Sequence, residues 1–176
     1  MIMALLVACS NDSVDDHTAQ GTQGARMEQG VMLYDDAMKQ RHADEADAVV
    51  TEAQAYIAAL RTAGAAQWSK RTGQHADMVV RITSTVDRQM RERDMGMNMA
   101  DERNGEAMGI SGAEYRRMRE QLRALRAEAK AFQNTDEAEV RQRMGPHLEQ
   151  LEEFVAVTAR SATYMRSQVR SSGSNR

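Results

Sequence analysis

The chain has 176 residues, of which 41% are hydrophobic and 28% charged, and its net charge at pH 7 is -3. The length suits one domain with a substantial core, and the single Cys excludes a disulfide scaffold and any Cys-rich zinc or iron–sulfur site. One Pro, 4% aromatic residues and 14 Met favour a helical chain over an all-β one, and the net charge gives no overall attraction to nucleic acid.

The chain begins with its only continuous apolar run, which ends at Cys9. The segment Leu6-Val7-Ala8-Cys9 resembles the lipobox of bacterial lipoprotein signal peptides: Leu, a small or apolar residue, a small residue, then Cys. The resemblance implies that residues 1–8 are a signal peptide remnant and that Cys9 carries a lipid. Because Ser10 rather than Asp follows, it also implies the periplasmic side of the outer membrane. Without a lipid, the segment would be an apolar N-terminus with an incidental Cys.

Polar segments flank the part of the chain that can fold. Residues 9–29 are rich in Ser, Asn, Asp, Thr, Gln and Gly, and almost none of their side chains is large and apolar. Such a composition buries too little surface to order itself, so we expect a flexible tether. Residues 171–176 are expected to form a short disordered tail, which leaves residues 30–170 for the folded domain.

Between residues 30 and 170, apolar residues recur three and four positions apart, which is the helix period. The first predicted helix runs from about residue 31 to 60 and ends near Gly64, which suits a C-cap. The second runs from about Trp68 to Met90 or, on a longer interpretation, to Met97, and gives way to a loop over 96–112. The third begins at the capping box Ser111–Glu114, and the fourth begins at Thr135.

Short connections after the first and third helices favour antiparallel neighbours, so the sequence predicts an all-α, antiparallel four-helix bundle. Gly145-Pro146 interrupts the fourth helix; a short helix ending at Met144 with a restart at Pro146 is favoured slightly over a kink. Four arginines line one strip of the third helix, which we call the arginine strip: Arg116, Arg119, Arg123 and Arg126. Folding the fourth helix back about Gln133-Asn134 predicts the ion pairs Arg116–Glu152 and Arg119–Glu149. A nucleic-acid face is disfavoured, because neither a basic excess nor aromatic stacking residues accompany the strip.

No catalytic motif is present in the sequence. The phosphate-binding Gly-Lys-Ser/Thr loop, the Gly-x-Ser-x-Gly elbow, His-Glu-x-x-His and the haem-attaching Cys-x-x-Cys-His are all absent. Ferritin-like di-iron sites need Glu three residues before His, and His42, His75 and His147 all lack it. We therefore expect a protein without enzymatic activity.

Methionine and histidine supply the candidate metal ligands. Counting helix levels predicts that six inward residues share one layer of the bundle, while His75 lies well away near one end; the six are Met38, His42, Met90, Met118, Met144 and His147. Thioether and imidazole ligands suit Cu(I), and His/Met pairs also serve as axial haem ligands. The competing interpretation is structural, because Met fills irregular gaps in helical cores and buried His can bond backbone or water.

A second metal candidate is the run Met95, Met97 and Met99, whose alternate side chains would project to one side of an extended loop. Clustered thioethers suit copper, whereas a patch packed on the bundle end or a flexible partner-binding surface would use the same residues. The sequence thus predicts a membrane-anchored periplasmic lipoprotein that acts as a non-enzymatic structural or partner-binding module, or self-associates through helix faces. The alternative is a periplasmic copper- or haem-binding protein.

Overall fold

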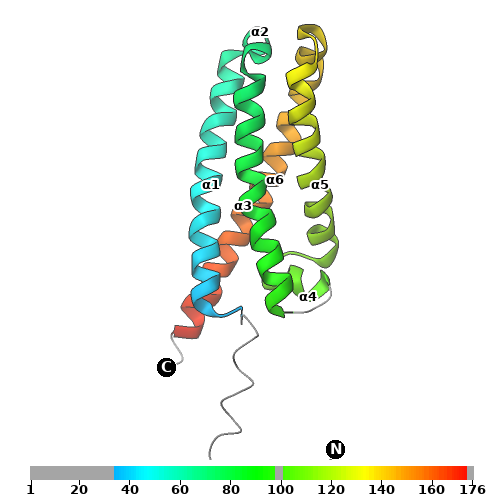
Figure 1. Cartoon of the computed structure of the whole chain (residues 1–176). Coiled ribbons are helices and arrows are strands. Elements are labelled where there is room, and N and C mark those ends of the chain that lie inside the picture. Colours follow the sequence, from blue (N-terminus) through cyan, green and yellow to red (C-terminus); the bar gives the residue numbers. More distant parts are fainter. Residues whose placement is uncertain (1–33, 98–100, 174–176) are drawn as a thin grey trace, which may run out of the picture. The chain divides into compact units, whose positions relative to one another are not determined.

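The computed structural model describes residues 34–97 and 101–173, and these residues fold into an all-helical bundle (Figure 1). Helix α1 spans Asp36–Ala63. It begins at Asp35, whose carboxylate accepts a hydrogen bond from the Met38 N–H at 2.8 Å. It ends at Gly64, which has φ +72° and donates its N–H to the carbonyls of Leu60 and Arg61. The predicted C-cap at Gly64 is confirmed.

A compact corner joins α1 to the next long helix. Helix α2 (Ala65–Trp68) and the 3-10 turn η1 (Ser69–Arg71) lead into α3 (Thr72–Met97). The indole N–H of Trp68 donates to the Leu60 carbonyl at 3.0 Å, which satisfies a carbonyl in the last turn of α1. The second helix therefore begins slightly later than predicted and runs on to Met97.

The predicted loop over 96–112 contains the short helix α4 (Asp101–Ala107). It turns into α5 (Gly112–Ala131) at Gly109, which has φ +68°. A Cβ atom at Gly109 would lie 2.4 Å from the Tyr164 ring, so only glycine permits this contact. The predicted capping box is confirmed: the Glu114 N–H donates to the Ser111 hydroxyl at 3.1 Å, and the Ser111 N–H donates to the Glu114 carboxylate at 2.9 Å.

The fourth long helix is continuous. After the 3-10 turn η2 (Phe132–Asn134), α6 spans Glu137–Gly173 and begins at Asp136, whose carboxylate accepts the Glu139 N–H at 3.0 Å. The favoured restart at Pro146 is wrong, because the helix passes through this residue. Pro146 and Gln142 are both exposed, so water can solvate the Gln142 carbonyl that lacks a backbone donor. Helix α6 also extends three residues into the predicted tail.

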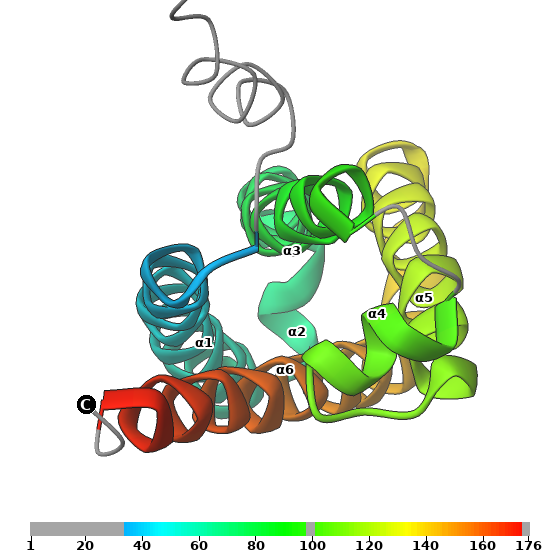
Figure 2. The same ribbon diagram turned by 90° about the horizontal axis from the view of Figure 1, so that it is seen from below.

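The four long helices α1, α3, α5 and α6 surround a shared core (Figure 2). Contacts between neighbours join low residue numbers in one helix to high numbers in the other, so adjacent long helices run in opposite directions. Side-chain contacts that show this join residues 45 and 88, 84 and 126, 128 and 143, and 61 and 152.

The core follows the inward stripes of these helices. Its largest fully buried apolar side chains come from all four of them: Leu60, Ile82, Met90, Tyr115, Met118, Leu125, Met144, Leu148, Leu151 and Phe154. Each such side chain contributes roughly 2 kcal/mol when removed from water. Among the described residues, the longest apolar stretch within any helix falls short of what crossing a membrane requires. Residues 1–8, Cys9, the tether 9–29 and Met99 lie outside the described residues.

Candidate functional site

All six residues of the predicted Met/His layer are buried, as their inward stripes indicate. They do not share one layer. His42 bonds Glu92 near the end of α3, whereas the His147 ring contacts His75 in the first turn of α3. Seventeen positions separate those two places on α3, which corresponds to about 25 Å along a helix.

The prediction of a common layer is wrong because α6 has reached Arg166 at the level of His42, where Arg166 bonds the Ala43 carbonyl, well beyond His147. A longer turn before α6 accounts for part of this shift. The η2 turn and the following residues place the start of α6 at Glu137. Met118 consequently lies beside Glu153, Ala156 and Val157, more than one helical turn beyond Met144 and His147. His75 lies near one end of the bundle and away from His42, as predicted, but His147 lies beside it there.

The first of two buried histidine sites lies toward the end of the bundle that carries α4. We call it the lower network: Tyr34, His42, Glu92 and Arg93. His42 Nε2 lies 2.8 Å from a carboxylate oxygen of Glu92, and the Glu92 carboxylate also accepts hydrogen bonds from Arg41 and Arg88. Burial alone would raise the pKa of Glu92, but hydrogen bonds from His42 and Arg88 outweigh it and lower that pKa to about 2.

Arg93 gives the lower network a buried positive charge. Its side chain is fully buried, its Nη2 donates to the Tyr34 hydroxyl at 2.6 Å, and its guanidinium lies 4.7 Å from the centre of the Tyr34 ring. Its Nε and Nη1 have no hydrogen-bond partner. Burial, opposed by Glu92 and reinforced by the charge of Arg93, lowers the pKa of His42. This site therefore disfavours any further cation.

The second site, the upper pair, consists of His75 and His147 at the end of the bundle that carries α2. Their ring centres are 4.9 Å apart, in an edge-to-face arrangement. The ring of Tyr56 stacks on His75 at 5.8 Å and that of Phe132 meets His147 at 5.3 Å. His147 Nδ1 lies 3.1 Å from a carboxylate oxygen of Glu128, which fixes the orientation of this ring.

Four buried polar atoms around the upper pair have no hydrogen-bond partner: both ring nitrogens of His75, Nε2 of His147 and the hydroxyl of Tyr56. Burial lowers the pKa of His75 to about 3, with a smaller effect from His147, and burial also lowers the pKa of His147. Burial raises the pKa of Tyr56 to about 12. Both imidazoles are therefore neutral at pH 7, and each can offer a nitrogen lone pair.

The upper pair combines one predicted site residue with one that the level count missed. A neutral imidazole held by a carboxylate through one nitrogen, with the other nitrogen free, is how proteins orient metal-ligating histidines. His75 lies on an inward stripe with Met78 three positions later, which was the available signal. Within residues 34–97 and 101–173, no three His, Cys, Asp or Glu side chains converge as one metal site.

The methionine run does not form the predicted extended loop where the structure describes it. Met95 and Met97 belong to α3, and the Met95 side chain is 68% exposed. Residues two positions apart on a helix do not face the same way. Met99 lies outside the described residues, and nearby Met108 is buried in the core.

The arginine strip faces α3 rather than α6, so the predicted Arg116–Glu152 and Arg119–Glu149 pairs are wrong. Arg119 bonds Asp94, Arg126 lies 3.4 Å from Asp87, and Arg116 lies 3.9 Å from Asp101. Glu152 instead pairs with Arg61 of α1 at 2.6 Å. The arginine strip thus joins α5 to α3 and to α4.

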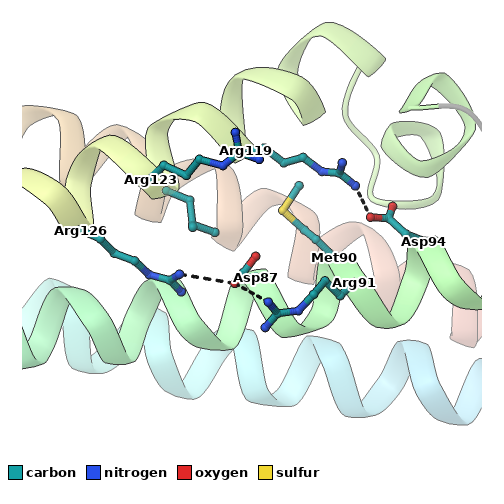
Figure 3. Close-up of a pocket in the computed structure, with 8 residues that line it drawn as sticks. Asp87, Met90, Arg91, Asp94, Arg119, Arg123 and Arg126 are labelled. Carbon is teal, nitrogen blue, oxygen red and sulfur yellow. Dashed lines mark hydrogen bonds and ion pairs between the residues drawn. The ribbon is translucent and has the colours of Figure 1, made fainter.

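A groove of about 350 Å³ runs between α3 and α5 beside this strip (Figure 3). Apolar side chains of Met90 and Leu122 line it between the charged residues, which are Asp87, Arg91, Asp94, Arg119, Arg123 and Arg126. Four arginines against two aspartates make the groove locally basic although the whole chain is acidic.

Comparison of the chain with protein-family models, curated proteins and solved structures finds no match.

Proposed function

We propose that this protein is a lipid-anchored, non-enzymatic partner-binding module on the periplasmic side of the bacterial outer membrane. The segment Leu6-Val7-Ala8-Cys9 would supply the anchor, and the polar residues 9–29 would hold the domain away from the bilayer. The domain itself would be an antiparallel four-helix bundle extended by the short helices α2 and α4. Opposite directions of neighbouring long helices support this fold.

The observation that carries the partner-binding role is the α3–α5 groove. Its arginines lie on the outside of the bundle above the buried side chains of Met90 and Leu122. Arginine is enriched in protein interfaces, and a basic groove favours an acidic partner segment. Arg123, which is exposed and central to the strip, would contact such a partner first.

The anchor is tested by changing Cys9 to Ser in the full chain, expressed in a bacterium with an outer membrane. The protein should lose incorporated radiolabelled fatty acid and move from the membrane to the soluble fraction. Ser10→Asp, which keeps the cysteine, should retain the lipid and shift the protein toward the inner membrane. Unchanged membrane association of the Cys9→Ser chain would refute the lipid anchor.

The groove is tested by placing a photo-crosslinking amino acid at Arg123 and, as a control, at exposed Glu149 of α6. A discrete adduct should form at position 123 and not at 149, and Arg119→Glu with Arg126→Glu should abolish it. Adducts of equal yield at both positions would refute the groove as the interface. An adduct of twice the chain mass would identify a second copy of this chain as the partner.

The metal-binding alternative no longer concerns the six-residue layer. Specific support for it now comes from the upper pair, where neutral histidine nitrogens are buried without partners. In the part of the chain that the structure describes, no comparable arrangement supports haem as the bound group.

A further inference from the structure

Three ring nitrogens and one hydroxyl are buried without partners at one place in the core, between α1, α3 and α6. A buried polar atom left without a hydrogen bond costs roughly 1–3 kcal/mol. His75 is 0% exposed and His147 is 1% exposed, so bulk water does not satisfy them. Retaining two histidines here is costly to the empty fold, and a ligand that accepts one lone pair from each ring would remove part of the cost.

The spacing of the two rings suits a shared metal ion. A metal about 2.0 Å from an imidazole nitrogen lies about 3.1 Å from the ring centre. Two rings whose centres are 4.9 Å apart then subtend an angle of about 100° at the metal. Rotation of the His75 ring about its Cβ–Cγ bond turns its nitrogens while leaving its centre almost in place, and that torsion is soft, whereas Glu128 holds the His147 ring.

We propose that His75 and His147 bind a Cu(I) ion in the upper core, with Nε2 as the ligand atom of His147 and Glu128 orienting it through Nδ1. This inference goes beyond the proposed partner-binding function and does not depend on the lipid anchor or on the α3–α5 groove.

The choice of Cu(I) follows from the charge and softness of the surroundings. Both ligands are neutral, and the desolvation cost of an ion rises with the square of its charge, so a monovalent ion is easier to bury here than Zn²⁺ or Cu²⁺. Met144 lies one turn before His147 and Met78 one turn after His75, each on the same helix face as its histidine. Thioethers at this position favour Cu(I) over harder ions.

The lower network provides an internal control. His42 also bonds a glutamate and also has an unpartnered ring nitrogen, Nδ1. The buried guanidinium of Arg93 stands close enough to lower the pKa of His42, and the same positive charge would repel a metal ion. We therefore expect a metal cation to bind at the upper pair and not at the lower network.

The experiment uses the full chain with Cys9→Ser, which removes the only thiol, purified without chelators and kept anaerobic with ascorbate. Competition against the chromophoric Cu(I) chelator bicinchoninate gives stoichiometry and affinity. We expect one Cu(I) per chain. His75→Gln or His147→Gln should weaken binding by about 100-fold or more, whereas His42→Gln should change it by less than about threefold.

X-ray absorption of the copper-loaded protein with both wild-type histidines gives a second readout that does not depend on variants folding. Imidazole scattering from two nitrogens should be present. Failure to compete with the chelator, absence of that scattering, or equal loss of affinity in His42→Gln would each overturn the proposal. Tighter binding of Zn²⁺ than of Cu(I) would overturn the assignment of the metal.

Discussion

The lower network and the upper pair begin from the same element, a buried histidine bonded to a glutamate, and differ in what faces the remaining ring nitrogen. In the lower network, a buried guanidinium stands nearby. In the upper pair, a second neutral histidine lies 4.9 Å away. The comparison teaches that the His–Glu pair alone does not define a site. A buried positive charge beside the ring opposes entry of a cation, whereas a neutral neighbour does not.

Acidification should produce the largest effect, because all three buried histidines have pKa values lowered in the folded state. The unfolded chain binds protons below its histidine pKa of about 6.5, whereas the folded chain resists them, so stability is lost as the pH falls. His75, with a pKa of about 3, should alone cost about 2 kcal/mol between pH 7 and pH 5. Urea unfolding of the metal-free protein measures the loss.

Replacing the upper histidines sharpens this test. A His75→Gln, His147→Gln chain should lose clearly less stability between pH 7 and pH 5 than the unmodified chain, because only His42 then takes up a proton on unfolding. Glu92, with a pKa of about 2, stays ionised in the folded protein throughout this window. An unchanged pH slope in the double variant would mean that the folded protein protonates the upper pair as readily as the unfolded chain does.

Replacing the glutamate of each buried histidine site should show which of the two carboxylates contributes more to the free energy of unfolding. Glu92 accepts hydrogen bonds from Arg41 and Arg88 besides its contact with His42, and its side chain is 18% exposed. Glu92→Gln should lower the free energy of unfolding by about 2 kcal/mol at pH 7. Glu128→Gln, at a more exposed position, should cost about 1 kcal/mol. A larger loss from Glu128→Gln would reverse the ranking.

Arg93→Met should remove the buried positive charge that distinguishes the lower network from the upper pair. Because the guanidinium is buried without a carboxylate partner, an apolar side chain of similar volume should raise the free energy of unfolding by about 1 kcal/mol. The pKa of His42 should rise, since Arg93 lowers it. Chemical denaturation and NMR titration of the His42 ring check both results; a fall in the His42 pKa would contradict the assigned electrostatics.

Removing the hydroxyl groups of Tyr56 and Tyr34 should change the stability of the metal-free protein slightly and in opposite directions. The Tyr56 hydroxyl has no partner, whereas the Tyr34 hydroxyl accepts from Arg93 and donates to the Met165 sulfur. Tyr56→Phe should therefore stabilise the metal-free protein by about 1 kcal/mol, and Tyr34→Phe should destabilise it by about the same amount. Thermal unfolding followed by circular dichroism compares them, and equal signs would show that the upper hydroxyl is satisfied in solution.

Local signals in the sequence predicted local structure well. The Gly64 C-cap, the Ser111–Glu114 capping box and the burial of the Met/His stripes depend on residues a few positions apart, and all are confirmed. The helix through Pro146 was missed because its acceptability depends on exposure of the Gln142 carbonyl, which only the fold determines.

Relative levels of distant residues were the weak point. Each connection adds its own error to a level count. At the level of His42, α6 has already reached Arg166, so His147 lies at the level of His75 instead. The level count also gave no information on which neighbouring helix the arginine strip faces, and the strip pairs with α3. A sequence of this kind therefore identifies which residues point inward more reliably than which of them meet.

Trp68, the only tryptophan of the chain, gives the upper end an optical reporter of its own. Its indole is bonded to the last turn of α1 and packs against the core a short distance along the chain from His75. Its fluorescence therefore follows events at that end, while circular dichroism averages over every helix. If the end that carries α2 loosens before the rest, emission and ellipticity will change at different denaturant concentrations.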